Sequence, residues 1–301
     1  MNTNETIGWG RVDGQALEIW DTLPIFNNHK ITLKDKVKLL FYPKKFLLYN
    51  YLKKNLKNKT SFKILDIGCG TGAAMIEMKK LFGNRLKIYG VDVIALQVDI
   101  ARERLVKYEI NGRVELVDSE ILPFADESFD AVYTSDVLGH VKNVQIWLKE
   151  INRILKPDGV LSMFAESKLG KHAYIRNYLL KHGLNTDPHA EFHISLFSKQ
   201  ELRNLLQSAG FKIEKMYSVF WAKFLVHPDE LYPALQNQSK FFILRKLNKL
   251  FYKIKMFTRP FSLAVCEFYG LIEMLTIGRW VESQGYVILS RKSVKSIKSK
   301  E

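Results

Sequence analysis

Residues 64–72 read ILDIGCGTG, and this stretch decides the fold. The apolar residues 62–67 predict a short strand, glycine follows at positions 68, 70 and 72, and residues 73–82 predict a helix. A strand, a glycine-rich turn and a helix in this order form a nucleotide-binding arrangement, because the glycines let the backbone approach a ligand and the helix N-terminus offers free N–H groups.

The glycine spacing separates this turn from two better-known nucleotide loops. It is G-x-G-x-G and not the dinucleotide pattern G-x-G-x-x-G, because Ala73 stands where the third glycine would be. The Gly-Lys-Ser/Thr of a P-loop is also absent from the sequence at this turn. Asp66 would repel a phosphate beside the loop, so we expect its carboxylate to help hold a cationic or amino-acid ligand.

Strands and helices alternate along the chain on either side of this turn. Further strands are predicted at residues 86–91, 114–117, 129–134, 160–165, 211–219 and 286–290, and further helices at 94–108, 144–155 and 202–209. The last of these helices follows a capping box formed by Ser198 and Glu201. Short connections between alternating elements predict an α/β fold whose mostly parallel sheet is covered by helices on both faces.

The same pattern predicts the domain organisation. A helical N-terminal extension is expected at residues 1–60, and the α/β domain at 61–220 with 284–292. A helical insertion is expected at 221–283 and a disordered tail at 293–301, where lysine and serine dominate.

Composition indicates an ordinary globular protein with an excess of positive charge. Of the 301 residues, 47% are apolar, and the two cysteines are too few for a disulfide framework. The N-terminus lacks the pattern of a signal peptide, so we expect a cytoplasmic protein. The net charge of +15 is concentrated at residues 30–59 and 237–259, which suggests an anionic partner such as a membrane surface, nucleic acid or an acidic substrate, or else simply solvated lysine-rich faces.

Further motifs follow the glycine turn at regular intervals. Residues 89–93 read YGVDV, 117–119 read VDS, 122–132 read LPFADESFDAV and 155–160 read LKPDGV. Together with ILDIGCGTG they resemble the class I (Rossmann-like) S-adenosylmethionine-dependent methyltransferases. The small-molecule branch that includes the ubiquinone and menaquinone biosynthesis enzymes is the most similar.

The resemblance implies a seven-stranded sheet with an antiparallel last strand, and S-adenosyl-L-methionine as the cofactor. Asp92 would accept hydrogen bonds from both ribose hydroxyls, and Asp118 would bind the adenine amino group. The full set of residues expected at the cofactor is Asp66, Gly68, Gly70, Gly72, Asp92, Val93, Asp118, Ser119 and Ser135.

Three residues are candidates for catalysis at the acceptor. Asp136 and His140 follow the fourth strand, and His193 precedes the capping residue of a later helix, at positions where the resembled family faces the acceptor. Each also has a structural interpretation: a helix cap, a loop-orienting side chain and a packing residue, respectively. No metal is expected, because residues 189–193 read H-x-E-x-H and not H-E-x-x-H, and no cysteine cluster accompanies them.

The insertion carries two unusual apolar segments. Residues 239–255 are basic and place apolar residues on one helical face, as an interfacial membrane helix does. Residues 261–280 are apolar enough for a membrane span but contain Glu267 and Glu273, which a lipid-exposed helix would tolerate poorly. We expect a helical lid over the active site, which can also contact an anionic membrane through residues 239–259 or form a homodimer interface.

These observations predict a methyltransferase that moves a methyl group to a small-molecule or lipid-like acceptor by in-line displacement. Two alternatives stay open: an RNA or protein methyltransferase, and a non-catalytic protein that binds S-adenosylmethionine or a membrane. Nucleic acid is the less favoured partner, because the sequence contains no recognised RNA-binding module. The expected location is the cytoplasm, with peripheral contact at the inner membrane surface.

Overall fold

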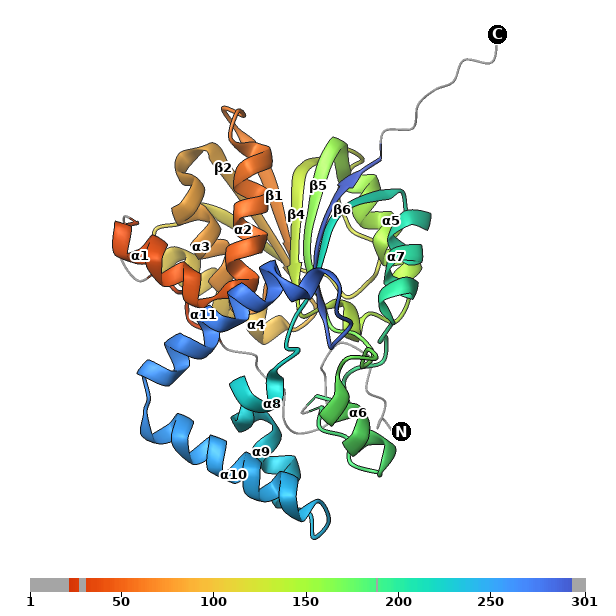
Figure 1. The fold of residues 1–301 in the computed structure, drawn as a ribbon. Helices are drawn as coiled ribbons and strands as arrows, with labels where there is room; N and C mark the ends of the chain where they lie inside the picture. The colour runs from red at the N-terminus through yellow and green to blue at the C-terminus, as the bar shows by residue number, and fades with distance from the viewer. Residues whose placement is uncertain (1–21, 27–30, 188, 294–301) are drawn as a thin grey trace, which may run out of the picture.

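The computed structural model describes residues 22–26, 31–187 and 189–293. At its centre lies a seven-stranded sheet in the order β3-β2-β1-β4-β5-β7-β6 (Figure 1). β7 pairs antiparallel with both β5 and β6, and the other strands run parallel to one another. The strands are β1 (Phe62–Ile67), β2 (Leu86–Asp92), β3 (Gly112–Leu116), β4 (Phe129–Ser135), β5 (Leu155–Ala165), β6 (Phe211–Ser218) and β7 (Tyr286–Lys292). The predicted fold class is confirmed.

Helices cover both faces of the sheet, and each face has its own apolar core. On one face lie α2 (Pro43–Leu56), α3 (Ala73–Phe82) and α4 (Ala95–Lys107). Their core includes the fully buried Leu48 and Met75. On the other face lie α5 (Val144–Ile154) and α7 (Lys199–Ser208), whose core includes Trp147 and Leu206. Burial on both faces explains why the central strands are almost continuously apolar.

The described part of the N-terminal extension forms a layer of this core. It includes α1 (Leu33–Lys38), η1 (Leu39–Phe41) and α2, and Pro43 is the first residue of α2. Ser162 Oγ of β5 donates to the Leu48 carbonyl at 3.0 Å, and Tyr51 Oη donates to the Ser290 carbonyl at 3.0 Å. The extension therefore lies directly on the sheet.

A buried glutamate on α3 holds the N-terminal segments in place. Glu77 accepts hydrogen bonds from the Ile25 backbone N–H at 2.8 Å, Lys45 Nζ at 2.9 Å and Tyr49 Oη at 2.5 Å. Its side chain is 0% exposed, so these three donors replace the water that a carboxylate would otherwise require. Glu77 thereby ties α3 to Lys45 and Tyr49 of α2 and to Ile25, which lies 52 positions earlier in the chain.

Part of the basic charge at residues 30–59 serves internal ion pairs. Lys45 binds Glu77, and Lys59 Nζ lies 2.6 Å from Asp130 Oδ1. Lys44 Nζ lies 3.2 Å from Asp136 Oδ1 inside the cavity described below. The lysine-rich segment is thus a source of structural pairing as well as of surface charge.

The insertion between β6 and β7 consists of helices that are joined to one another by buried polar groups. They are α8 (Lys223–Val226), α9 (Pro228–Gln236), α10 (Phe242–Phe257) and α11 (Phe261–Leu275). Lys255 of α10 is 4% exposed and its Nζ lies 2.6 Å from Asp229 Oδ1. Glu273 of α11 accepts hydrogen bonds from the backbone N–H groups of Trp221 and Ala222 at 2.8 and 3.0 Å. These contacts fix α10 to α9, and α11 to the segment that precedes α8.

Of the helices among the described residues, none is long and apolar enough to cross a membrane. The apolar segment 261–280 forms α11 followed by η4 (Ile277–Arg279). Glu267 is partly buried and Glu273 is buried, and burial raises the pKa of both carboxyls. The two carboxylates that argued against a membrane span therefore face the protein.

The structure differs from the sequence prediction in two places. Residues 156–159, between the predicted helix 144–155 and the predicted strand 160–165, are part of β5, which begins at Leu155 and has an irregular register opposite Phe129 and Ala131. A helix α6 (Tyr174–Lys181) was not predicted, because its exposed tyrosines weaken the apolar periodicity. The predicted tail at 293–301 lies outside the described residues except for Ser293.

Candidate active site

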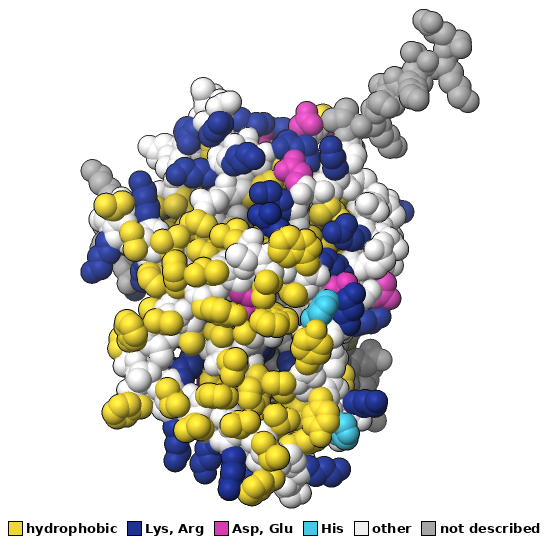
Figure 2. All heavy atoms as spheres, in the orientation of Figure 1, with side chains coloured by type: hydrophobic (Ala, Val, Ile, Leu, Met, Phe, Trp, Pro, Cys, Tyr) yellow, Lys and Arg dark blue, Asp and Glu magenta, His cyan; other side chains and the backbone are white. Residues whose placement is uncertain are grey.

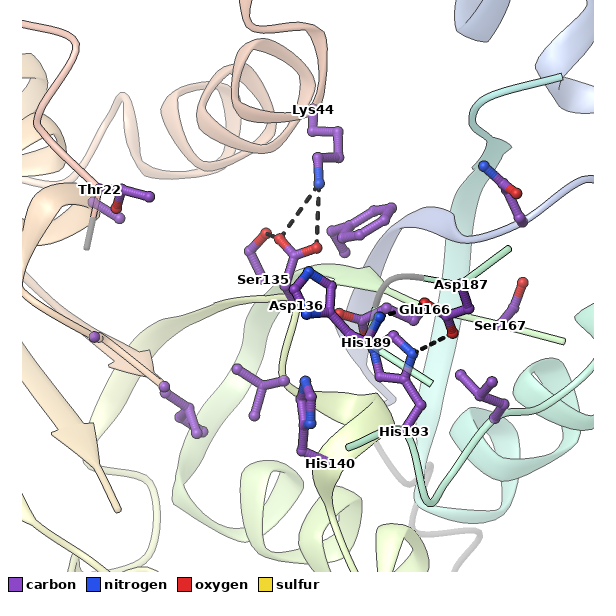
Figure 3. Close-up of a pocket in the computed structure, with 18 of the residues that line it drawn as sticks. Thr22, Lys44, Ser135, Asp136, His140, Glu166, Ser167, Asp187, His189 and His193 are labelled. Atoms are coloured by element: carbon purple, nitrogen blue, oxygen red, sulfur yellow. Dashed lines mark hydrogen bonds and ion pairs between the residues drawn. The ribbon is translucent and has the colours of Figure 1, made fainter. Parts of the chain in front are cut away.

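One cavity of about 830 Å³ lies at the carboxyl ends of β1, β2, β4 and β5. Ligands of open α/β sheets bind at this edge, near the point where the strand order reverses, and here that point lies between β1 and β4. The glycine loop forms one side of the cavity. Polar side chains from β4, β5 and residues 185–193 form the other (Figure 3).

The glycines of the loop are required by their conformations and neighbours. Gly68 has φ +70°, and a Cβ atom there would lie 2.2 Å from Val137 Cγ2. Gly72 has φ +83°, begins α3 and packs against Ala101 of α4. Both conformations are unfavourable for residues with a side chain. Gly68 and Gly70 line the cavity, whereas Gly72 does not, so the role of Gly72 is to let α3 begin close to α4.

Asp92 holds the glycine loop from the end of β2. Its side chain accepts a hydrogen bond from the Gly70 N–H at 2.8 Å and another from the Ile94 N–H at 3.0 Å. Asp92 is 7% exposed and lines the cavity together with Val93. The loop and the acid predicted to bind the cofactor are therefore one hydrogen-bonded unit.

Asp66 presents an unsatisfied acceptor at the same side of the cavity. It is 1% exposed, and among the described residues its Oδ2 atom has no hydrogen-bond partner. Burial, reinforced by the negative charge of Asp92, holds the pKa of this carboxyl well above its usual range. A buried polar atom without a partner indicates room for a donor from a ligand.

The third predicted acid is placed differently. Ser119 lines the cavity and its Oγ accepts a hydrogen bond from the Ile121 N–H at 3.0 Å. Asp118 precedes it but does not line the cavity, because β3 ends at Leu116 and the chain turns at this point. The adenine-binding role predicted for Asp118 stays a prediction.

This side of the cavity fits S-adenosylmethionine. The fitting features are a backbone cradle without side chains at Gly68 and Gly70, the carboxylate of Asp92 at the strand end, and the unsatisfied buried oxygen of Asp66. The carboxyl oxygens of Asp92 and Asp66 can accept hydrogen bonds, which suits a ligand with vicinal hydroxyls and an amino group.

The opposite side contains what we call the polar cluster, which consists of Asp136, His140, Glu166, Asp187 and His193. Asp136 follows β4 with φ +60°, and it accepts hydrogen bonds from Ser135 Oγ at 2.7 Å and Lys44 Nζ at 3.2 Å. Desolvation opposes ionisation of Asp136, but the Lys44 ammonium and these hydrogen bonds outweigh it and lower its pKa. Figure 3 shows Lys44 reaching this carboxylate from α2.

His193 and Asp187 form a hydrogen-bonded pair. His193 Nδ1 lies 2.7 Å from Asp187 Oδ2. Burial alone would lower the pKa of His193, but the hydrogen bond and charge of Asp187 outweigh burial and raise it. Burial likewise opposes ionisation of Asp187, yet the bonds from His193 and the His189 N–H bring its pKa to about 2. His193 is therefore oriented by Asp187, which also makes its ring more basic.

His140 is held in the opposite state. Its Nδ1 lies 3.0 Å from the Phe192 carbonyl oxygen, and its ring centroid lies 5.0 Å from that of His193. Burial and the nearby charge of His193 lower the pKa of His140 to about 4, so the ring is neutral at pH 7. The pKa values of the two neighbouring histidines are thus shifted in opposite directions.

Glu166 completes the polar cluster from the end of β5. Burial, reinforced by the negative charge of Asp136, raises its pKa to about 7. Ligand-type atoms of His140, Glu166 and His193 lie within 4.8 Å of one another, a spacing that a metal ion could bridge. The sequence pattern predicts no metal site, and we assign no metal to these residues.

The structure brings all three predicted catalytic residues, Asp136, His140 and His193, into one cavity with the glycine loop. Sequence reasoning missed Lys44, Glu166 and Asp187. Glu166 could have been found, because it directly follows the predicted strand 160–165, where α/β proteins place functional side chains. No local signal identifies Lys44, because its partner Asp136 is distant in sequence. None identifies Asp187 either, because Asp187 and its partner His193 lie in a segment without regular secondary structure.

The known proteins to which this chain is similar are methyltransferases. A methyltransferase domain matches residues 65–163. A demethylmenaquinone methyltransferase from Lactobacillus johnsonii is 30% identical over 174 residues, which cover 53% of this chain and 71% of that protein. A sterol 24-C-methyltransferase from Gibberella zeae is 32% identical over 117 residues, covering 38% of this chain and 30% of that protein.

A solved structure shows the same fold at low identity. It is the geranyl diphosphate C-methyltransferase from Streptomyces coelicolor, with a TM-score of 0.50 and 15% identity. The superposition covers 82% of this chain and 75% of that enzyme.

Proposed function

Because the chain belongs to the class I S-adenosylmethionine-dependent methyltransferases, we propose that it methylates a small, lipid-like acceptor held at the polar cluster. The observation that carries the proposal is the single cavity of about 830 Å³, which joins the glycine loop to this cluster. Ligand cavities commonly measure roughly 300–1,000 Å³, so this cavity has room for a cofactor and a second molecule.

S-adenosylmethionine supplies a methyl group that its sulfonium already activates, so the protein needs no covalent intermediate. We propose that Gly68, Gly70, Asp92 and Asp66 hold this cofactor, with Val93, Ser119 and Ser135 beside them. The remaining task of the chain is to orient the acceptor in line with the transferred methyl group and to exclude water. Positioning of this kind can supply most of the acceleration.

The acceptor proton is assigned to Glu166. A carboxyl with a pKa of about 7 is matched to proton transfer near neutral pH. Asp136, His140 and His193 are proposed to position the acceptor. The neutral His140 can accept a hydrogen bond, and the more basic His193, held by Asp187, can donate one. This division gives each of the predicted catalytic residues a role next to the acceptor.

The lipid-like nature of the acceptor rests on the relatives and on the insertion. The similar proteins named above are methyltransferases of demethylmenaquinone, a sterol and geranyl diphosphate, which carry extended apolar groups. The insertion contributes Phe220, which precedes α8, and Lys223, the first residue of α8, to the wall of the cavity. Our proposal includes peripheral contact of residues 239–259 with an anionic membrane and a location at the cytoplasmic membrane surface.

The test combines cofactor binding with acceptor screening. Wild type is titrated calorimetrically with S-adenosylmethionine and then incubated with methyl-labelled cofactor and a panel of polyprenyl quinols, sterols and prenyl diphosphates. We expect transfer to at least one class, and we expect His193→Ala to bind cofactor normally but to transfer at least tenfold more slowly. His182→Ala, at an exposed histidine outside the cavity, is the control. Cofactor binding without transfer to any member of the panel would overturn the lipid-like acceptor.

A further inference from the structure

The two long helices of the insertion, α10 and α11, carry many exposed apolar side chains. On α10 the exposed side chains are Phe242, Ile243, Leu247, Leu250, Ile254 and Phe257, and on α11 they are Phe261, Val265, Phe268, Ile272 and Leu275. We call these residues the insertion face. Figure 2 shows hydrophobic side chains gathered over this part of the molecule.

The exposure follows from helix geometry. Residues 261, 265, 268, 272 and 275 recur at intervals of three and four, so they form one stripe along α11. The inward side of α11 carries the buried Glu273, and the inward side of α10 carries the buried Asn248 and Lys255. Asn248 Nδ2 donates to the Pro228 carbonyl at 2.9 Å. The buried residues of α10 are both polar, whereas α11 buries Leu271 and Met274 beside Glu273. Both helices nevertheless leave a stripe of apolar side chains at the surface.

Basic residues border the apolar stripe of α10. Lys246, Lys249 and Lys253 are exposed and lie next to the stripe at three- and four-residue intervals. Residues 237–259 hold seven Lys/Arg and no acid. An apolar stripe bordered by lysines is the pattern of a helix that lies in the plane of a membrane interface and is attracted by anionic lipids.

We propose that the insertion face docks this protein on an anionic membrane surface, with α10 and α11 lying flat in the lipid interface. A contiguous apolar area of this kind is uncommon on a soluble monomer, where it marks an interaction site. A second copy of the chain would place the three lysines against the same lysines of its partner, whereas anionic lipids would neutralise them. The charge pattern therefore favours a membrane over a homodimer.

The docking face also lies next to the acceptor side of the cavity. Phe268 packs against Phe41 of η1 with ring centroids 6.3 Å apart, and Gly270 lies beside Pro43 at the start of α2. Lys44, the next residue, reaches into the cavity. One layer of helices thus separates the lipid from the acceptor site. This part of the inference rests on the proposed function, because it supplies a lipid-like acceptor directly from the membrane.

The test is flotation of the full-length protein with vesicles of phosphatidylcholine containing 25% phosphatidylglycerol. We expect wild type to float with these vesicles and at least tenfold less with pure phosphatidylcholine. The double variant Leu250→Glu/Ile272→Glu should lose at least nine-tenths of the bound fraction. Val106→Glu, at a site on α4 that is 79% exposed and far from the insertion in the sequence, is the matched control and should float like wild type.

Three results would overturn the docking proposal. Absence of wild-type flotation with the anionic vesicles contradicts the proposal, and so does equal flotation of wild type and the double variant. A wild-type dimer in sedimentation velocity that becomes a monomer in the double variant would assign the face to a second copy. Calorimetric titration of the same samples with S-adenosylmethionine keeps this test separate from the proposed function, because loss of docking leaves cofactor binding intact.

Discussion

The two sides of the cavity are built from very different spans of sequence. The cofactor side comes largely from β1, β2 and the turns that follow them, and its central hydrogen bond joins Gly70 to Asp92, only 22 residues apart. The acceptor side joins Lys44 to Asp136, which are 92 residues apart, and adds Glu166 and the pair Asp187–His193. The first side is a local structure and the second is assembled by the whole fold.

This difference has a physical cause. A cofactor that is the same in every member of a family can be held by one strand, one turn and one helix N-terminus. An acceptor has its own shape and its own proton to lose, so the groups around it come from whichever loops and helices the fold places there. Changes on the two sides should therefore separate binding of the cofactor from transfer of the methyl group.

The largest effect is expected at the centre of the cofactor side. Asp92→Ala removes the acceptor for the Gly70 and Ile94 N–H groups, so the glycine loop loses its support. We expect S-adenosylmethionine binding to weaken at least about 100-fold, measured by calorimetry, because two charge-assisted hydrogen bonds and the proposed ribose contacts are lost together. Asp99→Ala, at an exposed acid on α4, should bind like wild type. If Asp92→Ala bound S-adenosylmethionine within threefold of wild type, the claim that Asp92 and the glycine loop together hold the cofactor would be wrong.

The next effect is expected on the acceptor side and depends on pH. Because a base must be ionised, the transfer rate should rise with pH through the pKa of Glu166, about 7, and level off above it. Glu166→Gln should lower the rate by roughly 100-fold and remove this rise, with cofactor affinity unchanged. Glu191→Gln, at an exposed acid near His193, is the control. A Glu166→Gln variant that keeps the rise would assign the proton to another group.

A smaller effect is expected at the amino end of β4, at the opposite end of the strands from the cavity. A change there should lower the stability of the whole domain and should not separate cofactor binding from methyl transfer. The buried Asp130 carboxylate accepts hydrogen bonds from the Lys63 N–H at 2.8 Å, Lys59 Nζ at 2.6 Å and Lys156 Nζ at 3.0 Å. Burial opposes its ionisation, but these donors outweigh burial and lower its pKa. Asp130→Asn should therefore reduce the free energy of unfolding by about 2 kcal/mol at pH 7.

The pH dependence of this difference checks its cause. A carboxyl whose pKa is lower in the folded state stabilises the protein above its unfolded pKa, and the stability is lost as pH falls through the folded pKa. The gap between wild type and Asp130→Asn in urea unfolding should accordingly shrink below pH 4. A gap that is constant between pH 7 and pH 3 would mean that packing, not the ionised carboxylate, is responsible.

The smallest effect is expected from removal of metal ions. Since the sulfonium already activates the methyl group, we expect EDTA to change the transfer rate by less than about twofold, with no requirement for a Lewis acid. The measurement compares chelated enzyme with enzyme that has been resupplied with Zn²⁺. Loss of activity that Zn²⁺ restores would mean that His140, Glu166 and His193 do hold an ion.

Sequence reasoning succeeded where structure is local. The strand at Phe62–Ile67, the helix at Ala73–Phe82 and the capping box at Ser198 were predicted correctly, because each is specified by residues within one or two turns of each other. It could not find Lys44, whose partner Asp136 lies across the cavity, nor Glu77, which holds three donors from the N-terminal segments. Contacts between residues that are far apart in the chain produce no periodic pattern that a sequence could reveal.

The antiparallel strand β7 gives the insertion a property of its own. Residues 219–285 leave the sheet and return at adjacent positions, where the Val219 N–H donates to the Gly285 carbonyl at 3.2 Å and Ser218 pairs with Tyr286. A segment whose two ends touch can grow, shrink or be exchanged without shifting the strands that flank it. The insertion can therefore change in length or sequence without moving the sheet that carries the glycine loop and the polar cluster.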